Sequence, residues 1–101
     1  YTLPAPIAGS MFRFVYAGGA ADATDAIIIT PGNTNFYIGG VTFLDTDGNA
    51  ISSVFSNGSS NSSIQFNVPA GFDVTIMGLN TTNYQIFGNA TSTTAPAFAD
   101  Q

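Results

Sequence analysis

The sequence predicts an all-β domain, namely a two-sheet antiparallel β-sandwich of jelly-roll kind with about seven or eight short strands. Three observations support this fold class. Apolar and aromatic residues make up 45% of the 101 residues and recur at strand spacing. The chain lacks Lys and Glu, and it has no window in which apolar residues recur at helical intervals. Turn-forming residues separate the apolar segments at intervals of about 8–12 residues.

The predicted strands follow from local patterns. The first, Met11–Tyr16, alternates between two faces, with its aromatic residues on one face and Arg13 on the other. Residues 26–30 form a short apolar run, which is typical of a strand covered on both faces. A glycine pair separates two further predicted strands. These two are expected at 36–39 and 41–44, and the remaining strands at 51–55, 64–68, 72–76 and 84–88.

Two connections have distinct turn chemistry. Asp45-Thr46-Asp47-Gly48-Asn49 carries an Asp-Gly pair between strands, which favours a hairpin turn. Residues 68–72, with the sequence VPAGF, are expected to form a tight hairpin between strands of opposite direction. The low-complexity segment SNGSSNSS at 56–63 is expected to be a surface loop.

The chain is expected to form one β-sandwich domain over residues 1–88, followed by an extended C-terminal tail over residues 89–101. The tail has no strand period and contains Pro96. Phe98 is its one large apolar residue, so it belongs either to a frayed terminus or to an anchor onto a neighbouring subunit. Because the chain begins at Tyr1 and not at Met, we expect a processed product or a piece of a longer one.

Charged side chains are scarce. They make up 7% of the residues, with Arg13 as the one cation and a net charge of −5. One Arg is too little for phosphate contacts, so we expect no nucleic-acid partner and no binding to membranes. No apolar run approaches the roughly 20 residues of a transmembrane helix. The absence of Cys leaves no disulfide and no thiolate metal site.

Catalytic and metal-binding side chains are almost missing, so we expect no enzyme activity, no cofactor and no metal. Asp22 and Asp25 flank Thr24 and could act as a pair of hydrolytic carboxylates, whereas the alternative is a solvated loop. Residues 45–49 resemble the start of a calcium-binding loop, but no Glu is present to complete it, and a turn is expected there.

Arg13 and Phe98 are the candidate intersubunit contacts. Arg13 is expected to pair with an Asp across a strand or a subunit interface, or else to be an ordinary exposed residue.

Tyr16, Tyr37 and Tyr84 could stack on sugar rings, whereas packing within the sheets is the alternative. Chance explains the matches to the N-glycosylation pattern in a chain this rich in Asn, Ser and Thr, namely Asn57, Asn61, Asn80 and Asn89.

The edges of the predicted sheets favour assembly. Open sheets expose unpaired backbone groups, which proteins usually protect with Lys, other charges or Pro. This chain has no Lys and few charges to place there. We therefore expect other subunits to cover the edges, so that the protein is an oligomer.

An ordered set of short motifs spans about residues 3–88. The set is Leu3-Pro4-Ala5, Gly9, Phe12-Arg13-Phe14-Val15, residues 27–29, Ile38-Gly39-Gly40, Ile64-Gln65-Phe66, Ala70-Gly71, Val74-Thr75-Ile76 and Tyr84-Gln85-Ile86-Phe87-Gly88. In this order the motifs resemble small β-rich virion proteins of tailed bacteriophages, a group that includes capsid decoration (cement) proteins. Two features depart from that family: its closing strand often carries Trp where this chain has Tyr84, and the stretch that usually precedes the Leu-Pro motif is missing.

The resemblance implies a structural role. Proteins of this kind commonly sit as homotrimers on the outer capsid surface and clamp neighbouring major capsid subunits. The expected function is therefore non-enzymatic stabilisation of the outside of a phage capsid in the virion, with the chain itself and a major capsid protein as partners. The alternative is a receptor- or carbohydrate-binding β-module of a phage fibre or tail, or of a secreted protein.

Overall fold

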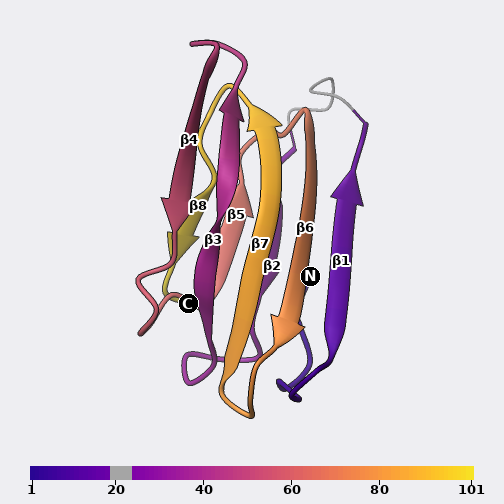
Figure 1. Ribbon diagram of the computed structural model, residues 1–101, viewed down its shortest axis with the longest axis vertical. Helices are drawn as coiled ribbons and strands as arrows, with labels where there is room; N and C mark the ends of the chain where they lie inside the picture. The colour runs from indigo at the N-terminus through magenta and orange to yellow at the C-terminus, as the bar shows by residue number, and fades with distance from the viewer. Residues whose placement is uncertain (19–23) are drawn as a thin grey trace.

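The computed structural model describes residues 1–18 and 24–101, and within these residues the chain forms eight strands and no helix (Figure 1). This confirms the predicted all-β class. In chain order the strands are β1 (Met11–Tyr16), β2 (Ala26–Ile29), β3 (Phe36–Asp45), β4 (Ala50–Phe55), β5 (Ser63–Phe66), β6 (Gly71–Gly78), β7 (Asn83–Ser92) and β8 (Ala97–Ala99).

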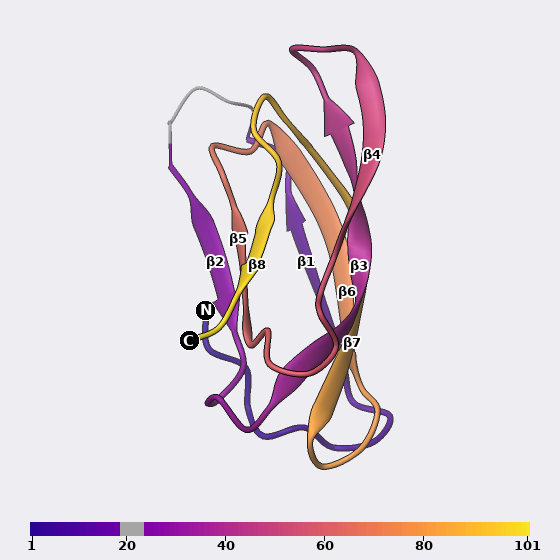
Figure 2. The same ribbon diagram turned by 90° about the vertical axis from the view of Figure 1, so that its left-hand side faces the viewer.

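The strands of the described chain form two sheets. One has five strands in the order β1-β6-β7-β3-β4, and the other has three in the order β2-β5-β8. Figure 2 shows the two sheets as the facing layers of a β-sandwich, which confirms the predicted architecture. Neighbouring strands are antiparallel except β3 and β7, which run parallel in the large sheet. The sequence patterns do not predict this parallel pair.

The glycine pair predicted to separate two strands lies inside one continuous strand, β3. Gly39 has a φ of 99°. Gly40 lies so close to the carbonyl oxygen of Val54 in β4 that a Cβ at this position would overlap it. Glycine accepts both situations because it has no Cβ. The prediction of two strands was wrong because these glycines permit a close backbone approach without ending the strand.

Residues 68–72 do not form the predicted hairpin. They carry the chain from β5 in the small sheet to β6 in the large sheet. Val68 adopts a positive φ of 39°, and Pro69 follows it and is buried. The Val68 N–H donates a hydrogen bond of 2.8 Å to the carboxylate of Asp25. The turn residues are therefore where the sequence places them, but the flanking strands belong to different sheets.

Strand β2 is covered on one face only. Ile28 is buried in the core, whereas Ile27 on the opposite face is 45% exposed. The prediction of a strand covered on both faces was wrong because the small sheet has the core on one side and solvent on the other. Residues 1–3 run along the free edge of β2, where the Leu3 N–H donates to the Ile29 carbonyl at 2.8 Å.

Residues 89–101 differ from the predicted extended tail because they belong to the sandwich. Strand β7 extends into this segment, and β8 pairs antiparallel with β5. Phe98 of β8 packs against the core, with its ring centroid 6.0 Å from that of Tyr37 in an edge-on arrangement. The side-chain amide of Gln101 donates to the Thr30 carbonyl at 2.9 Å. With three residues, β8 is too short to show a strand period in the sequence.

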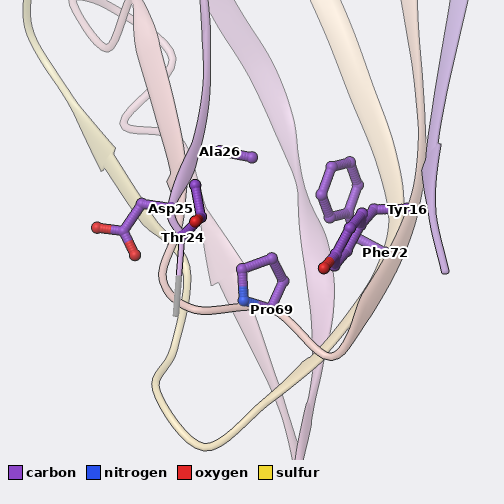
Figure 3. A pocket seen from close by; sticks show the side chains of 6 residues that line it. All are labelled: Tyr16, Thr24, Asp25, Ala26, Pro69 and Phe72. Carbon is purple, nitrogen blue, oxygen red and sulfur yellow. The ribbon is translucent and has the colours of Figure 1, made fainter. Parts of the chain in front are cut away.

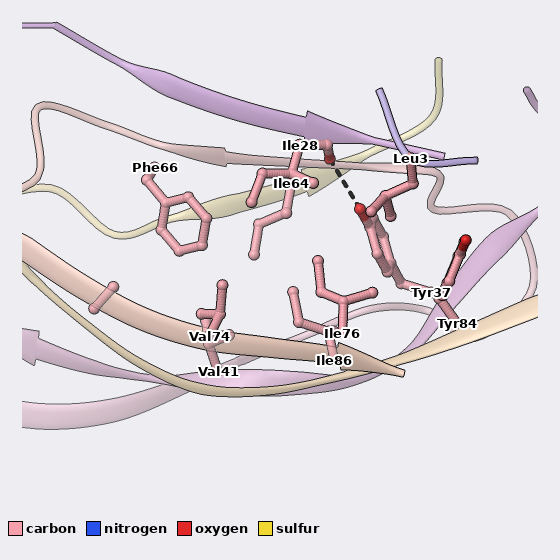
Figure 4. Close-up of a cluster of buried hydrophobic side chains, with 11 residues drawn as sticks. Leu3, Ile28, Tyr37, Val41, Ile64, Phe66, Val74, Ile76, Tyr84 and Ile86 are labelled. Carbon is pink, nitrogen blue, oxygen red and sulfur yellow. Dashed lines mark hydrogen bonds between the residues drawn. The ribbon is translucent and has the colours of Figure 1, made fainter. Parts of the chain in front are cut away.

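The hydrophobic core lies between the two sheets (Figure 4). Its largest fully buried side chains are Tyr37 of β3 and Tyr84 of β7. The Tyr37 hydroxyl donates to the Ile28 carbonyl at 3.0 Å, and the Tyr84 hydroxyl donates to the Pro4 carbonyl at 2.6 Å. The two phenols thus tie the large sheet to β2 and to the N-terminal segment. The other buried members are Leu3, Ile28, Val41, Ile64, Phe66, Val74, Ile76, Ile86 and Ala90.

Candidate interaction surface

The five-stranded sheet has one face in the core and one face turned away from the small sheet (Figure 2). We call the second face the outer face. Side chains alternate between the two faces along each strand. The outer face carries Met11, Arg13 and Val15 of β1, Asp73, Thr75 and Met77 of β6, Gln85, Phe87 and Asn89 of β7, Ile38 of β3, and Ile51, Ser53 and Phe55 of β4.

Apolar side chains of the outer face are strongly exposed on both edge strands of the sheet. On β4, Ile51 and Phe55 are 76% and 71% exposed. On β1, Met11 and Val15 are 62% and 60% exposed. Phe87 of β7, in the interior of the sheet, is also exposed. Large apolar side chains gathered on one exposed face are typical of a surface that binds a partner.

Arg13 and Asp73 form an ion pair on the outer face. The guanidinium donates from Nε to Oδ1 at 2.9 Å and from Nη2 to Oδ2 at 2.6 Å. The two residues are diagonal neighbours, because Arg13 lies directly opposite Thr75 in the register of β1 and β6. This agrees with the predicted pairing of Arg13 with an Asp across a strand. The hydrogen bonds and charge of Arg13 lower the pKa of Asp73, and the carboxylate in turn raises the pKa of Arg13.

A hollow of about 410 Å³ lies beside this ion pair in the outer face. It is lined by Arg13, Asp73, Thr75, Phe87, Gly88 and Asn89. A Cβ on Gly88 would overlap the backbone of Asp73, so this position requires glycine. The close approach of β7 to β6 at Gly88 also shapes the wall of the hollow.

The outer face carries almost no net charge, although the whole chain has a net charge of −5. Its single Arg is matched by Asp73. The other described carboxylates lie off this face, at Asp25 before β2, at Asp45 and Asp47 beside the β3–β4 turn, and at Asp100 after β8. A neutral apolar face lets two like-charged molecules approach with little repulsion.

Asp45 organises the β3–β4 turn. Its Oδ1 accepts hydrogen bonds from the backbone N–H groups of Asp47 at 2.9 Å and Gly48 at 3.2 Å. Asp45 pairs with Ala50 in the strand register, so residues 46–49 are a hairpin loop. This confirms the turn expected there. Among the described residues, no three His, Cys, Asp or Glu side chains gather in a way that could hold a metal ion.

A second cavity, of about 240 Å³, opens between the sheets at one end of the sandwich (Figure 3). It is lined by Tyr16, Thr24, Asp25, Ala26, Pro69 and Phe72. The carboxylate of Asp25 points away from the rings of Tyr16 and Phe72 in this view. It accepts hydrogen bonds from the Val68 N–H at 2.8 Å and from the Gln65 amide at 2.9 Å. Asp25 therefore fixes the connection between β5 and β6, and Asp22 lies outside the described residues.

The three tyrosines considered as a sugar platform do not lie on one surface. Tyr37 and Tyr84 are fully buried. Burial, reinforced for Tyr37 by the neighbouring Tyr84 and for Tyr84 by Tyr1, raises the pKa of each phenol. Tyr16 alone of the three lines the cavity at the end of the sandwich.

The side chains of several glycosylation-pattern asparagines are engaged in loop hydrogen bonds. Oδ1 of Asn57 accepts from the N–H groups of Ser59, Ser60 and Asn61 at 3.0, 2.9 and 3.1 Å. Oδ1 of Asn80 likewise accepts from the backbone N–H groups of Thr82, just before β7, and of Asn83, the first residue of β7. These side chains build turns, which is an ordinary use of Asn in loops.

The structure separates the two predicted intersubunit residues. Arg13 lies on the outer face of the large sheet, whereas Phe98 belongs to the small sheet and packs half-buried against the core. Sequence reasoning missed Asp73 as the partner of Arg13 and missed the exposed apolar side chains of β4. The alternation of Ile51, Ser53 and Phe55 was visible, but it identifies a strand without telling which face is exposed.

Comparisons with known proteins give no further identification: no protein-family model, curated protein or solved structure matches this chain. Within the described residues, no helix has the length and apolar composition needed to cross a bilayer. The functional interpretation therefore depends on the chain's own surface and motifs.

Proposed function

We propose that this protein is a non-enzymatic structural protein that decorates and stabilises the outside of a bacteriophage capsid. It acts as a homotrimer and clamps neighbouring major capsid subunits. The observation that carries the proposal is the outer face, which combines exposed apolar side chains with a single cation that Asp73 neutralises. The order of motifs from Leu3-Pro4-Ala5 to the Tyr84–Gly88 strand supports the phage assignment by resemblance.

The chemistry of the outer face suits mechanical clamping. Interface affinity would come from apolar burial and backbone contacts, because one Arg cannot supply many salt bridges. A specific interface buries about 800 Å² on each partner. The exposed side chains Phe87 and Ile38, in the interior of the sheet, offer an apolar contact for the capsid surface. Many such contacts around a particle would resist the internal pressure of a packaged genome.

The test uses purified particles of the source virus. The copy number of this chain is measured by gel densitometry relative to the major capsid protein, and comparable numbers are expected. Particles stripped of the chain should rebind the recombinant protein and regain thermal stability. A Phe87→Asp variant should lose rebinding, whereas Ile27→Asp on the small sheet, at a site of similar exposure, should retain it. A handful of copies per particle would instead indicate a fibre or tail component.

The cavity of Tyr16 and Phe72 favours one second candidate, a carbohydrate- or receptor-binding module. The two rings lie 5.9 Å apart and tilted, and aromatic faces are common platforms for sugar rings. In that case a glycan array should show binding that Phe72→Ala removes. Binding by the Phe87→Asp variant at the same level would place the sugar site in the cavity and not on the outer face.

A further inference from the structure

The five-stranded sheet ends in two edge strands of equal length, β1 and β4. Each has six residues. They run in opposite directions, because β7 and β3 form the one parallel pair in the sheet. Among the described residues, no strand pairs with the free side of either. Neither contains Pro or Lys, which are the usual protection of such an edge.

The free backbone groups of β1 belong to alternate residues. Just before the strand, the Ser10 carbonyl accepts a hydrogen bond from the Gly78 N–H at 2.8 Å. In an antiparallel ladder, residues bonded to the neighbour alternate with residues whose N–H and C=O point away from it. Residues 12, 14 and 16 therefore bond to β6. Met11, Arg13 and Val15 direct their backbone groups toward the free side.

The same alternation applies to β4. Just after the strand, the Ser56 N–H donates to the Gly39 carbonyl in β3 at 2.9 Å. Residues 50, 52 and 54 therefore bond to β3. Ile51, Ser53 and Phe55 direct their backbone groups toward the free side. On both edges, the residues with free backbone groups are those whose side chains lie on the outer face.

The two edges are complementary in one register. With the strands antiparallel and Arg13 opposite Ser53, Met11 lies opposite Phe55 and Val15 lies opposite Ile51. Residues directly opposite in an antiparallel pair share a face, and here all of them lie on the outer face. The four apolar side chains, each at least 60% exposed, would then cover one another. Arg13 would meet an uncharged Ser and keep its ion pair with Asp73.

Pairing of each edge with itself is less favourable. Two copies of β1 in the corresponding register would place Arg13 opposite Arg13, and like charges directly opposite destabilise a sheet. Two copies of β4 would place Ser53 opposite Ser53 and would cover Ile51 and Phe55, but β1 would stay open in both molecules. The head-to-tail contact leaves no edge of the large sheet unpaired.

We propose that β4 of one copy pairs antiparallel with β1 of the next copy, with Ser53 opposite Arg13, and that three copies close into a ring. The contact is heterologous, so it must close to avoid forming open fibres. This inference rests on the proposed function for the ring size of three. The pairing itself follows from the two edges and does not depend on the capsid.

The test uses engineered cysteines, because the natural chain has none. Val15→Cys with Ile51→Cys places two thiols opposite each other across the proposed contact. Their Cα atoms would be about 5.5 Å apart, within the disulfide range. Under oxidised glutathione, a non-reducing gel should show dimers and a trimer as the largest species. The off-register pair Val15→Cys with Phe55→Cys is the matched control, with its thiols displaced by about 13 Å along the strand.

The on-register pair should form intermolecular disulfides at least about tenfold faster than the off-register pair, because effective concentration falls steeply once groups cannot meet. Equal rates would overturn the proposed register. Ser53→Cys alone should remain monomeric on the gel, and its rapid self-linkage would overturn the head-to-tail contact in favour of two-fold β4 pairing. Cross-linked rings that fail to bind particles would leave this inference standing and remove the capsid role. Particle binding without on-register cross-linking would support the capsid role and overturn the proposed strand pairing.

Discussion

Tyr37 shows how a single residue joins the two sheets. Its ring is fully buried beside the Phe98 ring, and its hydroxyl reaches the backbone of β2 through the Ile28 carbonyl. Burial favours the neutral phenol, which raises the pKa of Tyr37 above its usual value. One side chain thus supplies both core volume and a polar connection between layers.

Replacing Tyr37 with Phe should lower the free energy of unfolding by about 1 kcal/mol, because the ring remains but the hydrogen bond is lost. The raised pKa also predicts alkaline sensitivity. The stabilisation that the neutral Tyr37 phenol gives the folded state is complete below the unfolded pKa of about 10. It is lost as the pH rises through the higher pKa of the folded state.

Urea unfolding at pH 7 and at pH 11 measures both effects. The Tyr37→Phe variant should lose less stability between these two pH values than the natural protein. Tyr16→Phe, at the edge of the sandwich, is the control. If the Tyr37→Phe variant loses as much stability between pH 7 and pH 11 as the natural protein, the alkaline sensitivity does not come from Tyr37.

The Arg13–Asp73 pair predicts an acid dependence. The hydrogen bonds and charge of Arg13 lower the pKa of Asp73 in the folded state. A lowered pKa gives a stabilisation that is complete above the unfolded pKa of about 4 and is lost as the pH falls through the folded value. The pair is solvent-exposed, with side chains 64% and 39% accessible, so the effect should be small.

Thermal melts of the natural protein and of Asp73→Asn between pH 7 and pH 2 test this dependence. The natural protein should melt higher at pH 7, and the difference should vanish at the acid end. Removing Arg13 by Arg13→Gln should abolish that pH-dependent difference. If Asp73→Asn still lowers the melting temperature by the same pH-dependent amount in the Arg13→Gln background, Asp73 acts through another partner.

At the scale of elements, β8 is the least expected part of the sandwich. It adds an edge strand to β5 and places Phe98 against the core. Hydrogen bonds hold the segment at both ends, from Asn67 to the Ala95 carbonyl at 2.8 Å and from Gln101 to the Thr30 carbonyl at 2.9 Å. Segment 89–101 therefore contributes to the stability of the domain.

Phe98→Ala should lower the free energy of unfolding by about 2 kcal/mol, less than the 3–5 kcal/mol of a fully buried Phe because this ring is half-buried. Ile27→Ala, on the exposed face of β2, should cost clearly less. Chemical unfolding monitored by circular dichroism measures both variants. If Phe98→Ala proves as mild as Ile27→Ala, β8 is not part of the cooperative fold.

Several elements could be predicted from sequence because their determinants are local. Alternation of apolar residues located β1, β5 and β6, and the Asp-Gly pair located the β3–β4 turn. The assignment of strands to sheets could not be predicted in this way. Val68 and Pro69 indicate a turn, but whether the chain reverses within a sheet or crosses to the other depends on distant residues.

The candidate surface was partly predictable for the same reason. Arg13 stands out as the one cation, and pairing with an Asp was one of the two alternatives for it, beside an ordinary exposed position. Asp73 could not be chosen from the sequence, because it lies on a different strand and the register of β1 and β6 sets the contact. The exposed side chains of β4 required knowledge of which sheet face is covered.

At the scale of the whole molecule, net charge and exposed apolar surface have opposite effects on self-association. The net charge of −5 makes copies repel, while the outer face offers neutral apolar contacts. The dimensions of 38 × 22 × 22 Å leave a small surface, so one interface involves a large share of it. Assembly should therefore be governed by apolar burial against a background of weak repulsion.

Added salt should strengthen self-association. Raising NaCl from about 50 mM to about 500 mM shortens the Debye length and screens the repulsion between copies. Sedimentation equilibrium should show several-fold tighter association at the higher salt. Ile51→Lys should reduce association at both concentrations, whereas Ile27→Lys should not. Dissociation on adding salt would mean that ion pairs, and not apolar contacts, hold the copies together.

The parallel pairing of β3 with β7 has a consequence for how the chain acquires its fold. Residues 36–45 have to meet residues 83–92 before the large sheet can be completed. Closing a loop of this length costs entropy before any contact compensates for it, and such topologies fold slowly. During synthesis, β3 therefore remains without its parallel neighbour until residues 83–92 have left the ribosome. The timing of folding is thus set by the C-terminal part of the chain.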